Sequence, residues 1–192
     1  MKQFKNKTCW NEFRPDKFEY NGTWIRNWFS NFILSVIVID NILYNSVENF
    51  YQAMKSISRN DHIYVAKLTP SQAKKWGRTF PEIRDDWEQV KYDFMKQALL
   101  AKFSIPIWKE KLLATGDEVL IEWNNWGDRI WGVAVVDNMG KNLLGIALME
   151  VREQLRLEGQ HKSIPVDELS NEDKGMYLLG QEPREEANAI NP

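Results

Sequence analysis

A glutamate and a lysine, Glu48 and Lys55, belong to one predicted helical stretch and could act together on a single substrate atom. Ser46 is a good N-terminal cap, because its hydroxyl can accept a hydrogen bond from an unpaired backbone N–H of the first turn. Glu48 then falls in that turn, where the helix dipole favours an ionised carboxylate. A lysine can hold an anion as a point charge or, when partly desolvated, attack an electrophilic carbon.

The same stretch also fits a helix with no catalytic role. At about 100° per residue, residues 45–57 divide into two faces. The apolar face carries Val47, Phe50, Met54 and Ile57, and the polar face carries Glu48, Gln52 and Lys55. Most polar faces of amphipathic helices are simply solvated. This stretch alone leaves both interpretations open.

Tryptophan is unusually frequent in this chain, with nine residues. One core does not easily absorb so many indoles, since each carries an N–H that needs a partner. Flat indole faces suit a nucleobase, and stacking contributes about 1 to 3 kcal/mol per base. Trp126 and Trp131 flank Asp128 in a polar loop, which places a carboxylate among indoles. For any single tryptophan, packing in the core is an equally good interpretation.

Composition restricts the class of protein. The 192 residues carry a formal net charge of −2, which provides no basic field for extended nucleic-acid binding. A single cysteine and two histidines exclude an internal disulfide and disfavour a metal centre, so we expect no metal and no cofactor. No apolar run approaches the roughly 18 residues of a membrane span, and the N-terminus lacks a signal-peptide pattern. We therefore expect a cytoplasmic protein without a membrane partner.

The elements that must position these side chains form one domain. Two apolar runs, 36–39 and 42–44, predict a hairpin across Asp40-Asn41. Helices are predicted over 46–56, 61–68, 70–77, 86–105, 106–114 and 143–157, and strands over 118–123 and 130–136. Gly77 and Gly159 are expected to end their helices. We expect an N-terminal segment over 1–27 packed on the domain, a core over 28–158, and a polar extension over 159–192 with a helical turn near 169–178.

Short motifs along the chain resemble, in order, the pattern of the NADAR family, also called YbiA-like. They are Phe29-Ser30-Asn31-Phe32, 46–55, 73–78, Trp87-Glu88, Lys102-Phe103, 112–116, Glu122 with 128–132, and 140–152. The resemblance covers about residues 28 to 155. Asn49 stands where the family usually has histidine, and Ala134 where glycine is common. These departures leave the choice of substrate more open than the fold.

The resemblance implies a compact, mainly helical α+β domain with a small hairpin or sheet, and hydrolysis of N-glycosidic bonds. Similar proteins act on ribosyl or ADP-ribosyl groups attached to a base nitrogen. The positions that match catalytic residues of the family are Glu48, Lys55 and Asp128. The positions that match residues shaping the pocket are Asn31, Gln52, Arg78, Trp87, Trp126, Trp131 and Asn142.

The chemistry of this reaction suits these residue types. Breaking a C1′–N bond develops positive charge at the anomeric carbon. A carboxylate such as Glu48 can stabilise this charge, or it can activate a water molecule that attacks the carbon. The departing base needs a proton, and Asp128 could supply it if Trp126 and Trp131 exclude water. A capping or turn role is the alternative for Asp128. Lys55 either binds an anion or forms a Schiff base with C1′ of a ring-opened sugar.

Two pocket residues have equally good structural interpretations. Arg78 could pair with a diphosphate through its fork of donors, or complement the negative end of the helix that precedes it. Asn142 could donate to ribose hydroxyls, or cap the last helix.

Three functions remain open at this stage. The first is removal of ADP-ribose from guanine, in nucleotides or in ADP-ribosylated DNA. The second is hydrolysis of ribosylated aminouracil intermediates of riboflavin synthesis, which the acidic overall charge slightly favours. The third is a non-catalytic module that binds ADP-ribose or NAD. The third would not need Glu48 and Lys55 together, so an enzyme is preferred.

Overall fold

The computed structural model describes residues 2–3, 18–20, 23–25 and 28–161, with side chains from Trp28 to Gly159. The strands are β1 (Lys2–Gln3), β2 (Phe18–Tyr20), β3 (Thr23–Ile25), β4 (Ile37–Ile39), β5 (Ile42–Tyr44), β6 (Trp123–Asn124), β7 (Val133–Ala134) and β8 (Met139–Gly140). The helices are α1 (Val47–Ala53), α2 (Arg59–Ala66), α3 (Pro70–Thr79), α4 (Trp87–Phe103), α5 (Pro106–Leu113) and α6 (Leu143–His161). This order confirms a mainly helical α+β fold.

The chain divides into two compact units, Met1–Leu155 and Arg156–Pro192. The hydrophobic core belongs to the first unit and is built from α1, α4, α6 and the β4–β5 hairpin. In the second unit the described residues, 156–161, continue α6. The helical turn expected near 169–178 lies outside the described residues. No helix within the described ranges is both long and apolar enough to cross a membrane.

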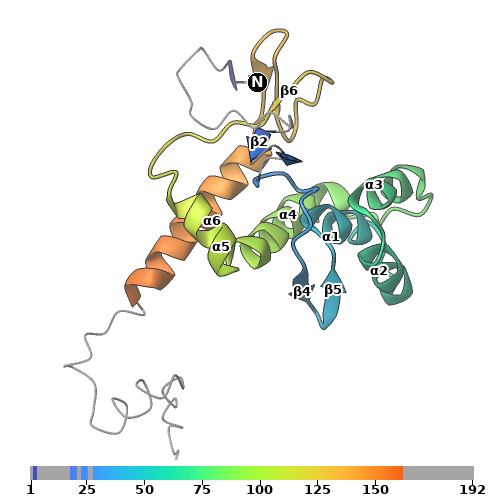
Figure 1. Cartoon of the computed structure of the whole chain (residues 1–192). Coiled ribbons are helices and arrows are strands. Elements are labelled where there is room, and N and C mark those ends of the chain that lie inside the picture. Colours follow the sequence, from blue (N-terminus) through green and yellow to red (C-terminus); the bar gives the residue numbers. More distant parts are fainter. Residues whose placement is uncertain (1, 4–17, 21–22, 26–27, 162–192) are drawn as a thin grey trace, which may run out of the picture. The chain divides into compact units, whose positions relative to one another are not determined.

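Helix α1 is the centre of the helical region, and all seven of its residues are buried. It packs against α2, α3 and α4 (Figure 1). The Ser46 hydroxyl accepts a hydrogen bond from the Asn49 backbone N–H at 3.2 Å, which confirms the predicted cap. The Asn49 side chain donates to the carbonyls of Val65 and Leu68, both at 2.8 Å. Asn49 therefore ties α1 to the end of α2.

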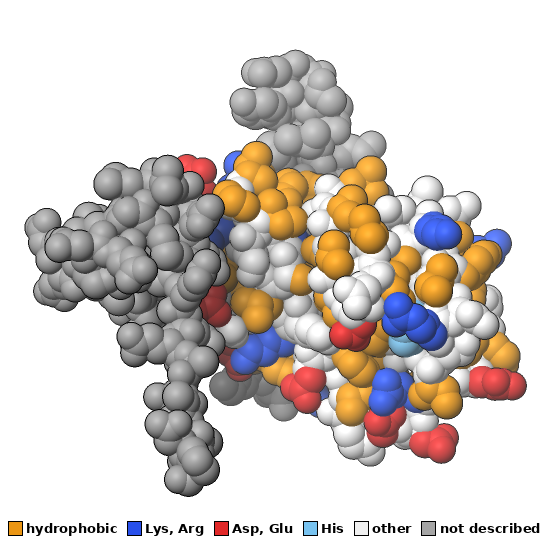
Figure 2. Space-filling view, turned by 90° about the horizontal axis from the view of Figure 1, so that it is seen from below, with side chains coloured by type: hydrophobic (Ala, Val, Ile, Leu, Met, Phe, Trp, Pro, Cys, Tyr) orange, Lys and Arg blue, Asp and Glu red, His pale blue; other side chains and the backbone are white. Residues whose placement is uncertain are grey.

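The β4–β5 hairpin confirms the turn that the sequence predicted. Asp40 and Asn41 both have positive φ angles, 51° and 59°, as a two-residue turn of this kind requires. Asn and Asp tolerate this conformation better than other residues with side chains. Ile37 and Tyr44 face the core, while Val38 and Leu43 face outward. Figure 2 shows hydrophobic side chains interspersed with charged ones on the face seen from below.

The two glycines that were expected to end helices lie inside them, so those predictions were wrong. Helix α3 passes Gly77 and ends at Thr79, and α6 passes Gly159 and ends at His161. Neither glycine has a positive φ angle, which a glycine helix stop normally adopts. The predicted apolar face of the first helix was also too long. Helix α1 ends at Ala53, and Ile57 is 83% exposed beyond it.

The strands expected over 118–123 and 130–136 are much shorter in the structure. Only β6 and β7 remain of them, and they pair in parallel with Trp123 opposite Val133. Strand β7 also pairs antiparallel with β8, and β8 with β1, so the sheet order is β1-β8-β7-β6. The rest of this region consists of loops held by side-chain hydrogen bonds, and these loops carry Asp128.

Candidate active site

Glu48 is buried at the start of α1, with 5% of its surface exposed. Its backbone N–H donates to the carbonyl of Asn31 at 3.0 Å, and its carboxylate accepts from the Gln52 side-chain amide at 2.9 Å. The sequence suggested an ionised carboxylate held by the helix dipole. Burial instead raises the pKa of Glu48, while the Gln52 hydrogen bond and the charges of Lys74, Lys55 and Arg78 act in the opposite direction.

Lys55 lies just beyond the end of α1 and is electrostatically coupled to Glu48. Its ammonium donates to the carbonyl of Gly77 at 2.6 Å and lies 5.9 Å from the centre of the Trp87 ring. Burial lowers the pKa of Lys55, and the neighbouring Glu48 partly offsets this effect. Lys55 is therefore a partly desolvated amine beside a buried carboxylate, which is the environment of a nucleophilic lysine.

Helix α3 contributes two further cations to this region, Lys74 and Arg78. They are four residues apart and so lie on one face of the helix. Both influence the ionisation of Glu48 and of Lys55. Arg78 is exposed in the last turn of α3, rather than beyond its end as expected. Lys74 is partly buried, with its ammonium 5.0 Å from the centre of the Phe32 ring.

Gly77 lets α3 approach α1 closely enough to place these charges. A Cβ atom at this position would lie 1.8 Å from the side-chain oxygen of Gln52. The absence of a side chain thus leaves room for Gln52, which in turn holds the Glu48 carboxylate. Gly77 also supplies the carbonyl that accepts from Lys55. The residue expected to stop a helix therefore serves as a close-packing contact between two helices.

Three aromatic rings connect the helical residues to the loop that follows β6. The Tyr51 ring lies 5.1 Å from Trp87 and 5.4 Å from Trp131, centre to centre. Trp87 is 8% exposed and also stacks on Phe94, so most of its surface is used in the core. Trp131 is partly buried and contacts Tyr51 edge to face. Of these rings, Trp131 has more free surface for a base.

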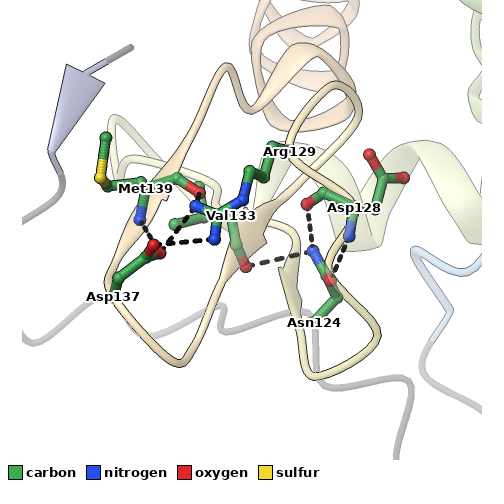
Figure 3. Close-up of polar contacts among 6 residues, drawn as sticks. All are labelled: Asn124, Asp128, Arg129, Val133, Asp137 and Met139. Atoms are coloured by element: carbon green, nitrogen blue, oxygen red, sulfur yellow. Dashed lines mark hydrogen bonds and ion pairs between the residues drawn. The ribbon is translucent and has the colours of Figure 1, made fainter.

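Asp128 is held in its loop by backbone contacts (Figure 3). One carboxylate oxygen accepts from the backbone N–H groups of Ile130 and Trp131, at 2.8 and 3.0 Å. The Asn124 side chain accepts from the Asp128 N–H and donates to the Asp128 carbonyl. Figure 3 shows the Asp128 carboxylate pointing away from Asn124. Its charge influences the ionisation of Tyr51 and of Glu122.

Trp126 and Asn142 have opposite surroundings in the structure. Trp126 is 54% exposed, so it does not enclose Asp128. Asn142 is buried, and both the oxygen and the nitrogen of its side-chain amide form hydrogen bonds with the backbone. Its oxygen accepts from the Glu122 N–H at 2.9 Å, and its nitrogen donates to the Leu120 carbonyl at 2.8 Å. Asn142 therefore fixes the segment before β6 with both polar atoms of its side-chain amide.

Asn31 lies next to Glu48 and has one unused hydrogen-bonding atom. Its amide nitrogen donates to the sulfur of Met95 at 3.5 Å. Its amide oxygen is buried and has no donor among the described residues. A buried acceptor without a donor is costly unless a ligand or water supplies one. Asn31 is thus suited to accept from a hydroxyl group of a bound sugar.

The structure therefore assembles most of the residues that the sequence singled out. Glu48, Gln52, Lys55 and Arg78 belong to one electrostatic cluster, and Asn31 contacts it through Glu48. Aromatic contacts connect this cluster through Trp87 and Trp131 to the Asp128 loop. Within the described residues, no group of three His, Cys, Asp or Glu side chains could hold a metal ion.

Three residues of this region were not among the predicted site residues: Tyr51, Lys74 and Glu122. Lys74 was predictable, because its spacing from Arg78 puts both on one face of a helix. Glu122 is one of the residues that carry the family resemblance, and it is also a carboxylate in an otherwise apolar run. Burial raises the pKa of Glu122 to about 8, and the charge of Asp128 acts in the same direction. No pattern in the sequence pointed to the bridging position of Tyr51.

Comparison with known proteins gives a consistent assignment. A family model of the NADAR domain matches residues 2–156. The chain is 39% identical to "N-glycosidase Npun_R5314" of Nostoc punctiforme, over 67% of this chain and 85% of that protein. It is 35% identical to "N-glycosidase YbiA" of Escherichia coli, over 68% of this chain and 82% of that protein. The NMR structure of E. coli YbiA superimposes with a TM-score of 0.63 and 34% identity, covering 69% and 80% of the two chains.

Proposed function

This chain belongs to the NADAR domain family, and on that premise we propose that it hydrolyses the bond between ribose C1′ of an ADP-ribosyl group and a base nitrogen. The base we propose is guanine, in a nucleotide or in ADP-ribosylated DNA. The observation that carries this proposal is the buried Glu48 carboxylate beside the partly desolvated Lys55 amine. The relatives named N-glycosidases support the type of bond that is broken.

Glu48 is proposed to act on the anomeric carbon. The transition state for breaking a C1′–N bond carries positive charge on the sugar ring, and a buried carboxylate stabilises such charge more strongly than an exposed one. The Gln52 side chain holds the carboxylate of Glu48, and the hydrogen bond to the Asn31 carbonyl holds its backbone N–H. A carboxylate fixed in this way does not need to reorganise as the charge develops.

Lys55 is proposed to form a covalent intermediate. An N-ribosyl amine can open to an imine at C1′, and the neutral Lys55 amine can then add to that carbon. The C1′–N bond to the base breaks, the base nitrogen takes up a proton, and water releases the sugar from Lys55. Because burial lowers the pKa of Lys55, a larger fraction of the amine is neutral and nucleophilic.

The cations of α3 are proposed to hold the diphosphate of the ADP-ribosyl group. Lys74 and Arg78 lie on one face of α3, and their charges reach the same carboxylate, Glu48. Arg78 offers a planar fork of donors that suits phosphate oxygens, and it is exposed enough to meet a ligand. Trp131 is proposed to stack on the base, and the free amide oxygen of Asn31 to accept from a ribose hydroxyl.

A second candidate substrate is a ribosylated aminouracil of riboflavin synthesis. One relative, "Riboflavin biosynthesis protein VVA0006" of Vibrio vulnificus, is 32% identical over 66% of this chain. The match covers only 35% of that protein. We rank this substrate second because the cation pair on α3 suits a diphosphate better than a single phosphate. A non-catalytic binding module ranks third, since it gains nothing from a buried carboxylate beside a lysine.

A panel of three substrates tests these alternatives. Base release is measured with ADP-ribosylated guanosine, an ADP-ribosylated oligonucleotide and ribosylaminouracil phosphate, and the Glu48→Gln variant serves as the inactive control. The proposal predicts that the wild-type protein releases guanine from at least one of the first two substrates and is slower on the third. Faster turnover of the aminouracil would reverse the ranking. Binding of ADP-ribose without turnover of any substrate would support the non-catalytic module.

The covalent step has a separate test. Borohydride added during turnover reduces a Schiff base to a stable amine, so a sugar-sized adduct should appear on the peptide that contains Lys55. The exposed Lys75 is an internal control, because it lies on the same protein but outside the electrostatic cluster. Turnover without an adduct would show that water attacks C1′ directly.

A further inference from the structure

We propose that His62 is a positioning residue for Lys55, because its hydrogen bond to the neighbouring Ser56 carbonyl holds the turn from which the amine reaches the site. The inference rests on the function proposed above, in which that amine attacks C1′. It starts from the place where α1 ends. The helix ends at Ala53, and Lys55 lies in the turn that follows. Regular helix geometry therefore stops short of Lys55, and the turn needs contacts of its own.

Lys55 is held at its side chain and at its backbone. Its ammonium donates to the Gly77 carbonyl at 2.6 Å, and its own carbonyl accepts from the Arg84 backbone N–H at 2.9 Å. The Arg84 carbonyl in turn accepts from the N–H of Trp87 at 3.1 Å, and the ring of Trp87 lies 5.9 Å from the Lys55 amine. A lysine stem is long and flexible, so the amine keeps one position only if the backbone beneath it is also fixed.

Ser56, the next residue, is buried and has a partner for each of its polar groups. Its N–H donates to the Ala53 carbonyl at 3.0 Å. Its hydroxyl donates to the Asp61 carboxylate at 2.6 Å and accepts from the Ser58 N–H at 3.0 Å. Its carbonyl lies 2.8 Å from Nε2 of His62. Two consecutive side chains at the start of α2 therefore hold the residue that follows the proposed nucleophile.

The His62 contact is a hydrogen bond from the ring to the backbone. A carbonyl only accepts, so Nε2 carries the hydrogen and donates it to Ser56. Ile57, the residue after Ser56, is 83% exposed, and the turn therefore gains little from packing on that side. Loss of the donor would leave the Ser56 carbonyl without this partner and allow the turn to shift. A misplacement of about 1 Å in a reacting group can lower a rate by about 100-fold, so His62 acts on turnover through the backbone of Lys55.

Two substitutions of His62 test this role through base release from ADP-ribosylated guanosine. Leucine removes the donor, whereas the amide N–H of glutamine can lie near the position of Nε2. His62→Leu should lower kcat by about tenfold and leave KM within about twofold of wild type, because the amine is displaced while the groups that bind the substrate stay in place. His62→Gln should recover kcat to within about threefold of wild type. Asn60→Ala, at an exposed position of the same helix, is the matched control.

The kinetic result overturns the proposal in either of two ways. One is a His62→Leu variant whose kcat stays within about twofold of wild type, and the other is an equal loss in the leucine and glutamine variants. Urea denaturation establishes that each variant is folded under the conditions of the assay. If His62→Leu does not fold, His62→Asn takes its place, because its side chain is polar but its amide is too short to reach the Ser56 carbonyl.

A second measurement follows the Lys55 amine without any substrate. Reductive methylation of the Lys55 peptide by formaldehyde and cyanoborohydride is measured against pH. The wild-type midpoint should lie below 10.5, because burial lowers the pKa of Lys55. His62→Leu should move the midpoint up toward 10.5, since the displaced amine gains water, and His62→Gln should not.

The methylation and turnover results separate the two proposals. Equal methylation midpoints in wild type and His62→Leu would overturn the role of His62. A wild-type protein that hydrolyses none of the substrates would overturn the proposed function, while the methylation result would still decide whether His62 positions the amine.

Discussion

The two sides of the candidate site are built in different ways. On the helical side, α1 and α3 place Glu48, Lys55 and Lys74 by helical spacing and by the close contact at Gly77. On the loop side, residues 118–142 contain little regular structure, and buried amide side chains hold the backbone in place. The charged side chains of the helical side are therefore positioned by helix geometry, while the side chains of the loop side are positioned by a few hydrogen bonds.

The largest effect should come from the helical side. Glu48→Gln keeps the size of the side chain but removes the charge that we propose acts on the anomeric carbon. We expect kcat to fall by about 100- to 1000-fold, which is the range for losing one electrostatic contact to a transition state. Glu110→Gln is the matched control, because Glu110 is exposed on α5. Steady-state base release measures both variants, and equal rates would show that Glu48 has no part in catalysis.

On the loop side, the expected effect comes from the hydrogen bonds that hold the backbone in place. Asn142→Ala removes both amide contacts to the segment before β6 and leaves a buried N–H and a buried carbonyl unpaired. We expect a loss of about 2 to 4 kcal/mol in the free energy of unfolding, and a drop of roughly tenfold in kcat. Urea denaturation and base release measure the two effects. The exposed Asn125, changed to Ala, is the control. A variant as stable as wild type would show that these hydrogen bonds do not hold the loop.

A change at Gly77, where α1 and α3 are in close contact, should have a moderate effect on turnover. Gly77→Ala places a methyl group where the Gln52 oxygen now lies, so Gln52 must move and its hydrogen bond to Glu48 weakens. We expect kcat to fall by about three- to tenfold, since one neutral-to-charged hydrogen bond is at stake. Gly159→Ala is the control, because an added Cβ there meets no other atom within 4 Å. Unchanged kinetics in Gly77→Ala would mean that Gln52 does not position Glu48.

Lys102 provides a buried lysine outside the site, and its effect should appear in stability alone. Its ammonium donates to the carbonyls of Trp28 and Ser30, and burial lowers its pKa to about 7. Between pH 7 and its unfolded value near 10.5, the unfolded chain holds a proton that the folded protein lacks. The free energy of unfolding should therefore rise with pH through this window, by at most about 1.4 kcal/mol per pH unit.

The variant Lys102→Met tests this interpretation. It removes the titrating group, so the contribution of Lys102 to the rise in stability above pH 7 should disappear. Urea denaturation at several pH values between 7 and 9 measures the slope for both proteins. An identical slope in wild type and variant would contradict the lowered pKa of Lys102. The contrast with Lys55 is that the latter has a carboxylate neighbour, Glu48, and should affect turnover.

The helical side was largely predictable from the sequence, because its signals are local. The Ser46 cap and the Asp40-Asn41 turn depend on neighbouring residues, and the structure confirms them. The predictions that helices end at Gly77 and Gly159 were wrong, because a glycine can also allow close packing or stand where no constraint acts on it. Local pattern does not distinguish these cases.

The loop side was not predictable to the same degree. Asn142 contacts residues 20 and 22 positions earlier in the chain, and sequence spacing gives no information on such pairs. For the same reason the sequence left the role of Asn142 open between a sugar contact and a helix cap, and gave no sign of its hydrogen bonds to the Leu120 carbonyl and the Glu122 N–H. The exposure of Trp126 likewise depends on how the loop folds back after β6. Long-range hydrogen bonds of this kind therefore determine how the loop side folds, and sequence spacing does not reveal them.

A double-mutant cycle of Glu48→Gln and Lys55→Met tests the central claim most directly, that the two side chains act as a unit on one sugar carbon. The four proteins are compared by kcat for base release from ADP-ribosylated guanosine. If the two residues act together, the double variant should be no slower than the slower single variant, within a factor of about three, because residues of one catalytic unit are not additive. If the two losses multiply, Glu48 and Lys55 act independently, and the account of a joint site is wrong.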